Sequence, residues 1–193
     1  MVWPIFGDHD VKFEAITHLM SSADDIVVAI IGGTFLEEAV ERTLKERMRD
    51  NKDVSDRLFD LTKPLSSTSA QIDVLYMLWG IESHVRETML GICRIRNFFA
   101  HNMGVNFDSD DPKFTKHLPK LNLHERHETY PDARFGTPTS KKIKTPKNNR
   151  ETFIVNLQLC LNYLMQDRCK HIAYSTQLVS YEELRKKVGK PWV

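Results

Sequence analysis

The chain has 193 residues, of which 41% are hydrophobic, 27 are lysine or arginine and 26 are aspartate or glutamate, so its formal net charge is +1. This length is typical of a single domain, and the hydrophobic content is sufficient for a core. The balanced charge excludes a global electrostatic attraction to nucleic acid or to a membrane surface, so any such attraction must come from a local patch.

The start of the chain has no basic segment followed by an apolar run, which excludes a secretory signal peptide as an interpretation. The longest apolar run, 26–33, is far shorter than the roughly 20 residues of a membrane span. Cys93, Cys160 and Cys169 are odd in number and form no Cys-x-x-Cys pair, which favours buried thiols over disulfides or a zinc site. We therefore expect a cytoplasmic protein that does not enter a membrane.

Helical spacing of apolar residues predicts a first helix at 11–20 and a longer one at 24–50, after the N-capping segment 21–25. Gly32 and Gly33 lie inside the longer helix, where each glycine costs roughly 1 kcal/mol relative to alanine. We expect a neighbouring helix to approach closely at this pair. A phosphate-binding role is disfavoured because no strand precedes the glycines and no Lys-Ser or Lys-Thr follows them.

A short helix or turn is predicted at 54–61, before Pro64. Thr68 and Gln71 then have the spacing of a capping box, and the helix that they begin has its apolar side at 72–79. The next helix begins near Glu82 and ends at 102–104. Four apolar residues mark its buried stripe: Val85, Met89, Ile92 and Phe99. We expect this helix to help to form a homodimer.

The segment 105–150 contains five of the eight prolines and many charges, which predicts a long irregular excursion with one short helix. Between residues 136 and 150 there are five basic residues and no acidic one, so Lys141, Lys142 and Lys144 would be available to contact phosphate. The alternative is a solvated charge run. Helices are then predicted at 151–171 and 180–188.

No segment has sustained strand alternation. The sequence therefore predicts an all-α protein: one domain over residues 1–193, built as a compact helical bundle of about five to seven helices, with 105–150 as its excursion.

Three groups of segments together resemble the mannitol operon repressor (MtlR-like) family over roughly residues 24–114. They are 58–60 with 64–66, 70–76 with 79–81, and 92–101 with 105–108. The element Arg-Asn-Phe-Phe-Ala-His, from Arg96 to His101, is the most specific part. The resemblance implies a transcription-associated regulator, a repressor by the family's name. Because no helix-turn-helix signature is present, we expect it to act through protein–protein contacts rather than through a DNA-reading helix.

The same Arg-x4-His spacing resembles the HEPN superfamily of small helical bundles, many of which are metal-independent ribonucleases. That resemblance implies an alternative function as a toxin or defence ribonuclease. Arg96 would hold the scissile phosphate, His101 would transfer protons and Asn97 would orient either group. As a site for a ligand or a partner instead, the motif would bind through Arg94, Arg96, Asn97 and His101.

Helix geometry constrains this alternative. Five residues correspond to about 140° around an ideal helix, so Arg96 and His101 converge only if the helix unwinds near Ala100 or a second subunit completes the site. Asn97, His101 and Arg94 share a face. In the structural alternative, Arg96 pairs with an acid such as Asp73 or Glu37, and His101 stabilises the carboxyl end of its helix.

His117, His124 and His127 form a loose cluster with Glu125 and Glu128. Two histidines three residues apart could bind a metal on a helix, but a solvated cluster is the simpler interpretation because His-Glu-x-x-His is absent. We expect no metal and no cofactor. The expected partners are a second copy of the chain and another protein, with RNA only under the ribonuclease alternative and direct DNA binding disfavoured.

Overall fold

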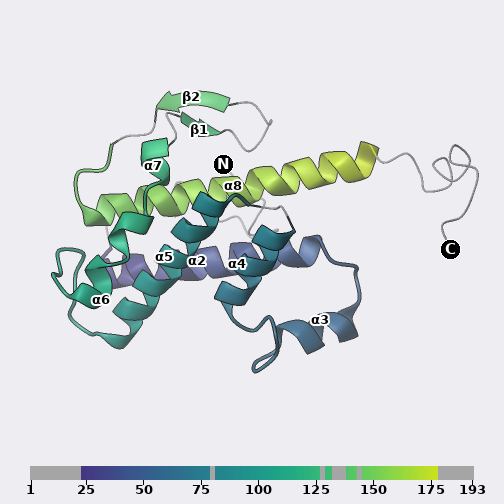
Figure 1. Ribbon diagram of the computed structural model, residues 1–193, viewed down its shortest axis with the longest axis horizontal. Helices are drawn as coiled ribbons and strands as arrows, with labels where there is room; N and C mark the ends of the chain where they lie inside the picture. The colour runs from purple at the N-terminus through teal and green to yellow at the C-terminus, as the bar shows by residue number, and fades with distance from the viewer. Residues whose placement is uncertain (1–22, 79–80, 127–128, 132–137, 143–144, 178–193) are drawn as a thin grey trace, which may run out of the picture.

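The computed structural model describes residues 23–78, 81–126, 129–131, 138–142 and 145–177, with side chains from 165 onward and in the two strands left undescribed. The long elements are α2 (Asp25–Glu46), α3 (Lys52–Phe59), α4 (Thr68–Met77), α5 (Ser83–His101) and α8 (Asn149–Gln177). They confirm the predicted all-α bundle (Figure 1). The helices expected at 11–20 and 180–188 lie outside the described residues. Within the described ranges, no helix is both long and apolar enough to cross a membrane.

Helix α2 is central in the bundle. Helices α4 and α5 lie side by side across it, and α8 packs along it in the same direction (Figure 1). Val28, Leu36, Val40 and Leu44 of α2 are at most 1% exposed, as expected for a helix with neighbours on several sides.

The apolar stripe of α5 is buried as predicted. Val85, Met89, Ile92 and Phe99 are all fully buried by the rest of the same chain. Because these residues are covered within one subunit, any homodimer contact of α5 would have to use its exposed residues.

Phenylalanines from four segments meet at the carboxyl-terminal end of α5. The Phe99 ring lies 4.8 Å from that of Phe107 and 5.9 Å from that of Phe114, and Phe107 lies 5.3 Å from Phe153, between ring centroids. All four side chains are at most 1% exposed. Their packing fixes the segment after α5 and the start of α8 against the end of α5.

Side-chain caps begin several helices. Asn51 accepts a hydrogen bond from the Val54 amide at the start of α3, and Ser67 accepts one from the Ala70 amide at the start of α4. The N-cap of α4 is therefore Ser67, and the capping box predicted at Thr68 and Gln71 is wrong. Gln71 is 3% exposed, and its Nε2 donates to the Leu65 carbonyl at 2.7 Å instead of closing a box.

The excursion 105–150 is less irregular than predicted. It contains the short helices α6 (Pro112–Thr115), η2 (Leu118–Lys120) and α7 (Leu123–Arg126). A two-stranded antiparallel hairpin follows, formed by β1 (Thr129–Pro131) and β2 (Pro138–Lys142). The buried Asn156 of α8 holds the excursion to the bundle: its Oδ1 accepts from the Leu123 amide at 2.8 Å and its Nδ2 donates to the Leu121 carbonyl at 3.1 Å.

Arg150 belongs to the bundle rather than to a free basic loop. Its guanidinium pairs with Asp25 and donates to the Ala23 carbonyl, and Asp25 also accepts from the Phe107 amide at 2.9 Å. These contacts join the starts of α2 and α8. Arg150 is therefore not one of the cations available to a ligand.

Candidate functional site

The motif from Arg96 to His101 forms the last part of α5. The helix continues through His101, and its C-cap is Asn102. The Asn102 side chain donates to the Phe98 carbonyl at 2.7 Å, which satisfies a carbonyl that the end of the helix would otherwise leave free. The helix therefore does not unwind near Ala100, which is one of the two conditions that would let Arg96 and His101 converge.

Arg96 is a contact between α5 and α2. A Cβ added to Gly33 would lie 2.4 Å from Cγ of Arg96 and 2.6 Å from its Cβ, so only glycine leaves space for this side chain. The guanidinium then reaches Glu37, four residues further along α2, with 3.2 Å between Nη2 and Oε2. This geometry confirms the close helix approach predicted at the glycine pair.

Asn97 adds a further hydrogen bond to this contact. Its Oδ1 accepts a hydrogen bond from Nη1 of Arg96 at 3.0 Å. The side chains of Arg96 and Glu37 are 29% and 27% exposed, so the ion pair is partly shielded from solvent. Of the two acids proposed as partners of Arg96, Glu37 is confirmed, and Asp73 pairs with Arg86 instead, at 2.6 Å.

Arg94, Asn97 and His101 lie on one exposed face of α5, as their spacing predicted. Arg96 points to α2, about 140° away from His101 around the helix axis. Within one chain the arginine and the histidine of the motif are therefore not brought to a common point, and a shared site would need a second subunit.

His117 lies beside this exposed face, although it is far from α5 in sequence. Partial burial lowers the pKa of its imidazole, and the nearby charges of Arg94, Lys116 and Lys120 lower it further. The η2 segment packs on α5 because Gly91 has no side chain: a Cβ there would lie 3.1 Å from Cβ of Lys120. The sequence did not indicate that Arg94 and His117 lie close together. Its one signal was Gly91, a glycine inside a helix that requires close packing as a reason.

The histidine cluster does not form a metal site in the described part of the chain. His124 Nδ1 lies 2.9 Å from Nδ2 of Asn156, so it is part of the contact that holds α7 to α8. No group of three His, Cys, Asp or Glu side chains that could hold a metal ion is found among the described residues. His127 and Glu128 lie outside them.

Cys93 and Cys160 are buried free thiols, as predicted. Burial raises the pKa of Cys93 to about 12, with a further increase from the Glu37 carboxylate and opposing effects of Arg96 and Arg94. Burial also raises the pKa of Cys160. Both thiols are thus poor nucleophiles near neutral pH. The side chain of Cys169 is among those not described.

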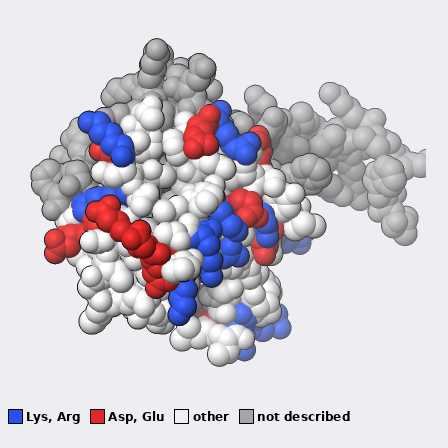
Figure 2. All heavy atoms as spheres, turned by 60° about the vertical axis from the view of Figure 1, so that its left-hand side comes forward, with Lys and Arg blue, Asp and Glu red and all other residues white. Residues whose placement is uncertain are grey.

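Lys141 and Lys142 lie in β2, where side chains are not described, and Lys144 lies outside the described residues. Figure 2 shows the face around α6 and the starts of α2 and α8. On that face lysine and arginine side chains lie next to aspartate and glutamate side chains. A basic patch is the electrostatic footprint of a nucleic-acid site, whereas the described residues of this face have the two signs side by side.

Comparison with known proteins gives no match: no family model, no curated protein and no solved structure is similar to this chain.

Proposed function

We propose that this protein is a non-enzymatic helical regulator of the mannitol operon repressor type, which acts in transcription by binding another protein. The observation that supports this most strongly is the division of the Arg-Asn-x-x-Ala-His motif. Arg96 is engaged by Gly33, Glu37 and Asn97 inside the subunit, whereas His101 lies exposed on another face of α5.

The ribonuclease alternative needs a guanidinium and an imidazole at the same phosphate. An Arg96 that already neutralises Glu37 would have to give up that pair before it could bind an anion, which lowers its affinity for phosphate. We therefore assign Arg96 to helix packing and propose no catalytic role for Arg94, Asn97 and His101, which lie exposed on another face of α5.

The exposed end of α4 also supports a protein-binding role. Tyr76, Met77 and Leu78 are consecutive and are 39%, 72% and 48% exposed. Neighbouring apolar side chains in contact with solvent are typical of surfaces that bind other proteins. We expect the regulator to work in the cytoplasm as a homodimer, for which light scattering should give twice the 22.4 kDa of one chain.

The experiment is RNA cleavage by the purified protein in EDTA, beside a His101→Ala variant with the same unfolding midpoint. We expect no cleavage by either protein. Because His101 is exposed, its loss should leave the fold intact, so the variant reports chemistry rather than stability. Cleavage by the parent that disappears in the variant would overturn the proposal in favour of the ribonuclease.

A further inference from the structure

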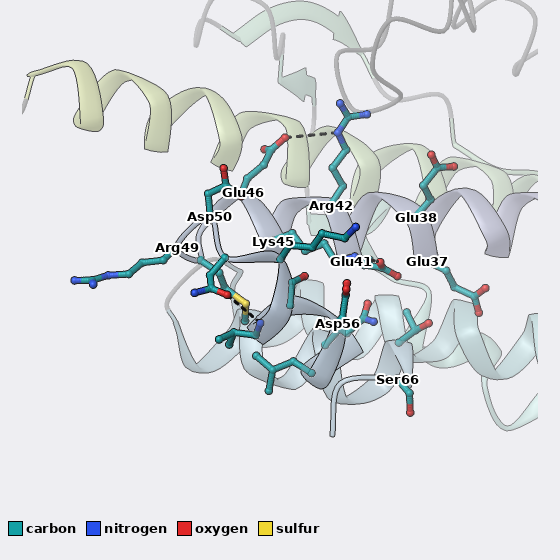
Figure 3. A pocket seen from close by; sticks show the side chains of 18 of the residues that line it. Glu37, Glu38, Glu41, Arg42, Lys45, Glu46, Arg49, Asp50, Asp56 and Ser66 are labelled. Carbon is teal, nitrogen blue, oxygen red and sulfur yellow. Dashed lines mark hydrogen bonds and ion pairs between the residues drawn. The ribbon is translucent and has the colours of Figure 1, made fainter. Parts of the chain in front are cut away.

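A groove lies between the second half of α2 and α3, and the start of α4 contributes to its lining. Its volume is about 1420 Å³. Figure 3 shows charged side chains from α2 along one wall and residues of α3, including Asp56, opposite. Apolar side chains also line it, namely Met48, Val54 and Leu58.

The groove exists because α3 packs against the core mainly through its last two residues, Leu58 and Phe59. No residue of α3 is buried, and its backbone makes little close contact with the other described helices. Leu58 and Phe59 at its end are partly buried against the core. In addition, the Leu65 amide donates to the Leu58 carbonyl at 2.8 Å, and Lys45 Nζ lies 4.7 Å from the centre of the Phe59 ring. Val54 is 40% exposed, and Met48 and Leu58 are only partly buried, so the groove keeps apolar surface that another chain can cover.

The charges in the groove are unevenly distributed. Six carboxylates and four cations line it. Two of the cations are already paired on α2, Lys45 with Glu41 at 2.6 Å and Arg42 with Glu46 at 3.6 Å. In Figure 3, Arg49 lies at one end, near Asp50, whereas Glu37, Glu38, Glu41 and Asp56 lie toward the other end.

Glu38 and Asp56 are the two carboxylates of this acidic end that are exposed and form no ion pair with any described residue. They are therefore open to an incoming cation.

Gln71 adds an independent observation. It lines the groove and is 3% exposed. Its Nε2 is used by the Leu65 carbonyl, whereas its Oε1 has no hydrogen-bond donor among the described residues. A buried acceptor without a donor costs free energy, so this atom favours any ligand that can bring an N–H group to it.

From these observations we propose that the groove binds an amphipathic segment of a partner protein that carries lysine or arginine side chains. The cations would lie against Glu38 and Asp56 with one donor directed at Oε1 of Gln71, and the apolar side chains would pack on Met48, Val54 and Leu58. Lysine and arginine offer donors and no acceptor, which matches an end of the groove that offers acceptors. The inference rests on the proposed function, because it names the chemistry of the partner that the regulator binds.

The size and lining of the groove favour a peptide segment over a small ligand. Small-molecule sites are mostly apolar and occupy about 300–1000 Å³. This groove is larger and carries charged groups along its length, which suits an amphipathic helix laid into it.

The test uses the full chain and a fluorescein-labelled helical peptide with leucines on one face and lysines on the other. We expect saturable binding by fluorescence anisotropy, with one peptide per chain and an affinity that falls as salt is raised. The matching peptide with glutamate in place of lysine should not bind.

Variants locate the binding site. Asp56→Lys should weaken peptide binding at least tenfold, because it places a like charge at the acidic end. The control is Asp53→Lys, an equal change on an exposed residue of α3 that does not line the groove, and it should stay within twofold of the parent. Neither substitution removes a buried residue, so both variants should remain folded.

A neutral change tests Gln71 separately. Gln71→Met should weaken the affinity while leaving its salt dependence unchanged, because an uncharged acceptor is lost. Circular dichroism and the unfolding midpoint of this variant establish that the fold is retained.

Equal binding of the lysine peptide to the parent and to Asp56→Lys would overturn the inference, as would equal weakening by Asp56→Lys and Asp53→Lys. Either result, with no RNA cleavage, would leave the proposed function standing with its partner bound elsewhere. Cleavage that depends on His101 would instead overturn the proposed function, whatever the peptide does.

Discussion

Helix α2 meets α5 and α3 in opposite ways. At the crossing with α5, Gly33 lets the stem of Arg96 lie directly on the α2 backbone, and Glu37 closes the contact with an ion pair. Between α2 and α3 the side chains instead line an open groove, and no residue of α3 is buried. The comparison separates residues that determine the fold from residues that remain available for binding, even though both kinds are charged.

The largest difference between the two regions should appear when apolar residues are truncated. Phe99→Ala removes a fully buried ring that packs on Phe107 and Phe114, and should lower the free energy of unfolding by about 3–5 kcal/mol. Val54 lines the groove and is 40% exposed, so Val54→Ala should change the free energy of unfolding by less than about 0.5 kcal/mol. Urea unfolding measures both, and similar losses would contradict the distinction.

The contact between Gly33 of α2 and Arg96 of α5 should also be destabilised by a single added methyl group. Gly33→Ala forces Arg96 out of its position and should cost about 1–3 kcal/mol of unfolding free energy, despite the better helix propensity of alanine. Thr34→Ala is the matched control: Thr34 is the next residue of α2 and is exposed to the groove, so its loss should have little effect. Unchanged stability of Gly33→Ala would mean that the two helices are further apart.

Neutralising one carboxylate in each region should give a smaller difference in unfolding free energy. Glu37→Gln weakens a partly buried pair with Arg96 and should cost about 1 kcal/mol. Glu41→Gln removes an exposed pair with Lys45 one turn away and should cost at most about 0.5 kcal/mol. A double-mutant cycle between Glu37 and Arg96 measures the coupling directly, and a coupling near zero would remove Arg96 from the packing role.

The smallest effect concerns pH. Partial burial and the charges of Arg94, Lys116 and Lys120 lower the pKa of His117 in the folded chain, so the unfolded chain binds a proton more readily. The stability that results is present above the ordinary histidine pKa of about 6.5 and is lost as the pH falls below it. His117→Gln should therefore reduce the loss of stability between neutral and mildly acidic pH. An identical pH profile for parent and variant would show that another group is responsible.

The positions of the long helices could be predicted because their signals are local. Apolar spacing predicted a helix at 24–50 where α2 spans Asp25–Glu46, and one from about Glu82 to 102–104 where α5 spans Ser83–His101. Gly33 also allowed a correct prediction of close helix packing, because a glycine inside a helix is destabilising unless a neighbouring helix needs the space.

The rest depended on contacts between residues that are distant in the sequence. Gln71 lies three residues after Thr68, which is the spacing of a capping box. In the folded chain its side-chain amide donates to the Leu65 carbonyl instead, because the preceding loop folds back toward α4. His117 belonged by composition to a histidine cluster, and only the packing of η2 on α5 places it beside Arg94. The groove has no sequence signature, because its carboxylates have the pattern of any solvated helix face.

The most direct test of the account is an NMR titration of the full chain with the lysine-bearing amphipathic peptide, following backbone amide shifts. We expect the largest changes in the groove, at Glu38, Asp56 and Gln71, while Arg94, Asn97 and His101 stay unchanged. The opposite result would contradict this expectation: the largest shift changes at Arg94, Asn97 and His101, with no changes in the groove. The motif at the end of α5 would then be the binding site.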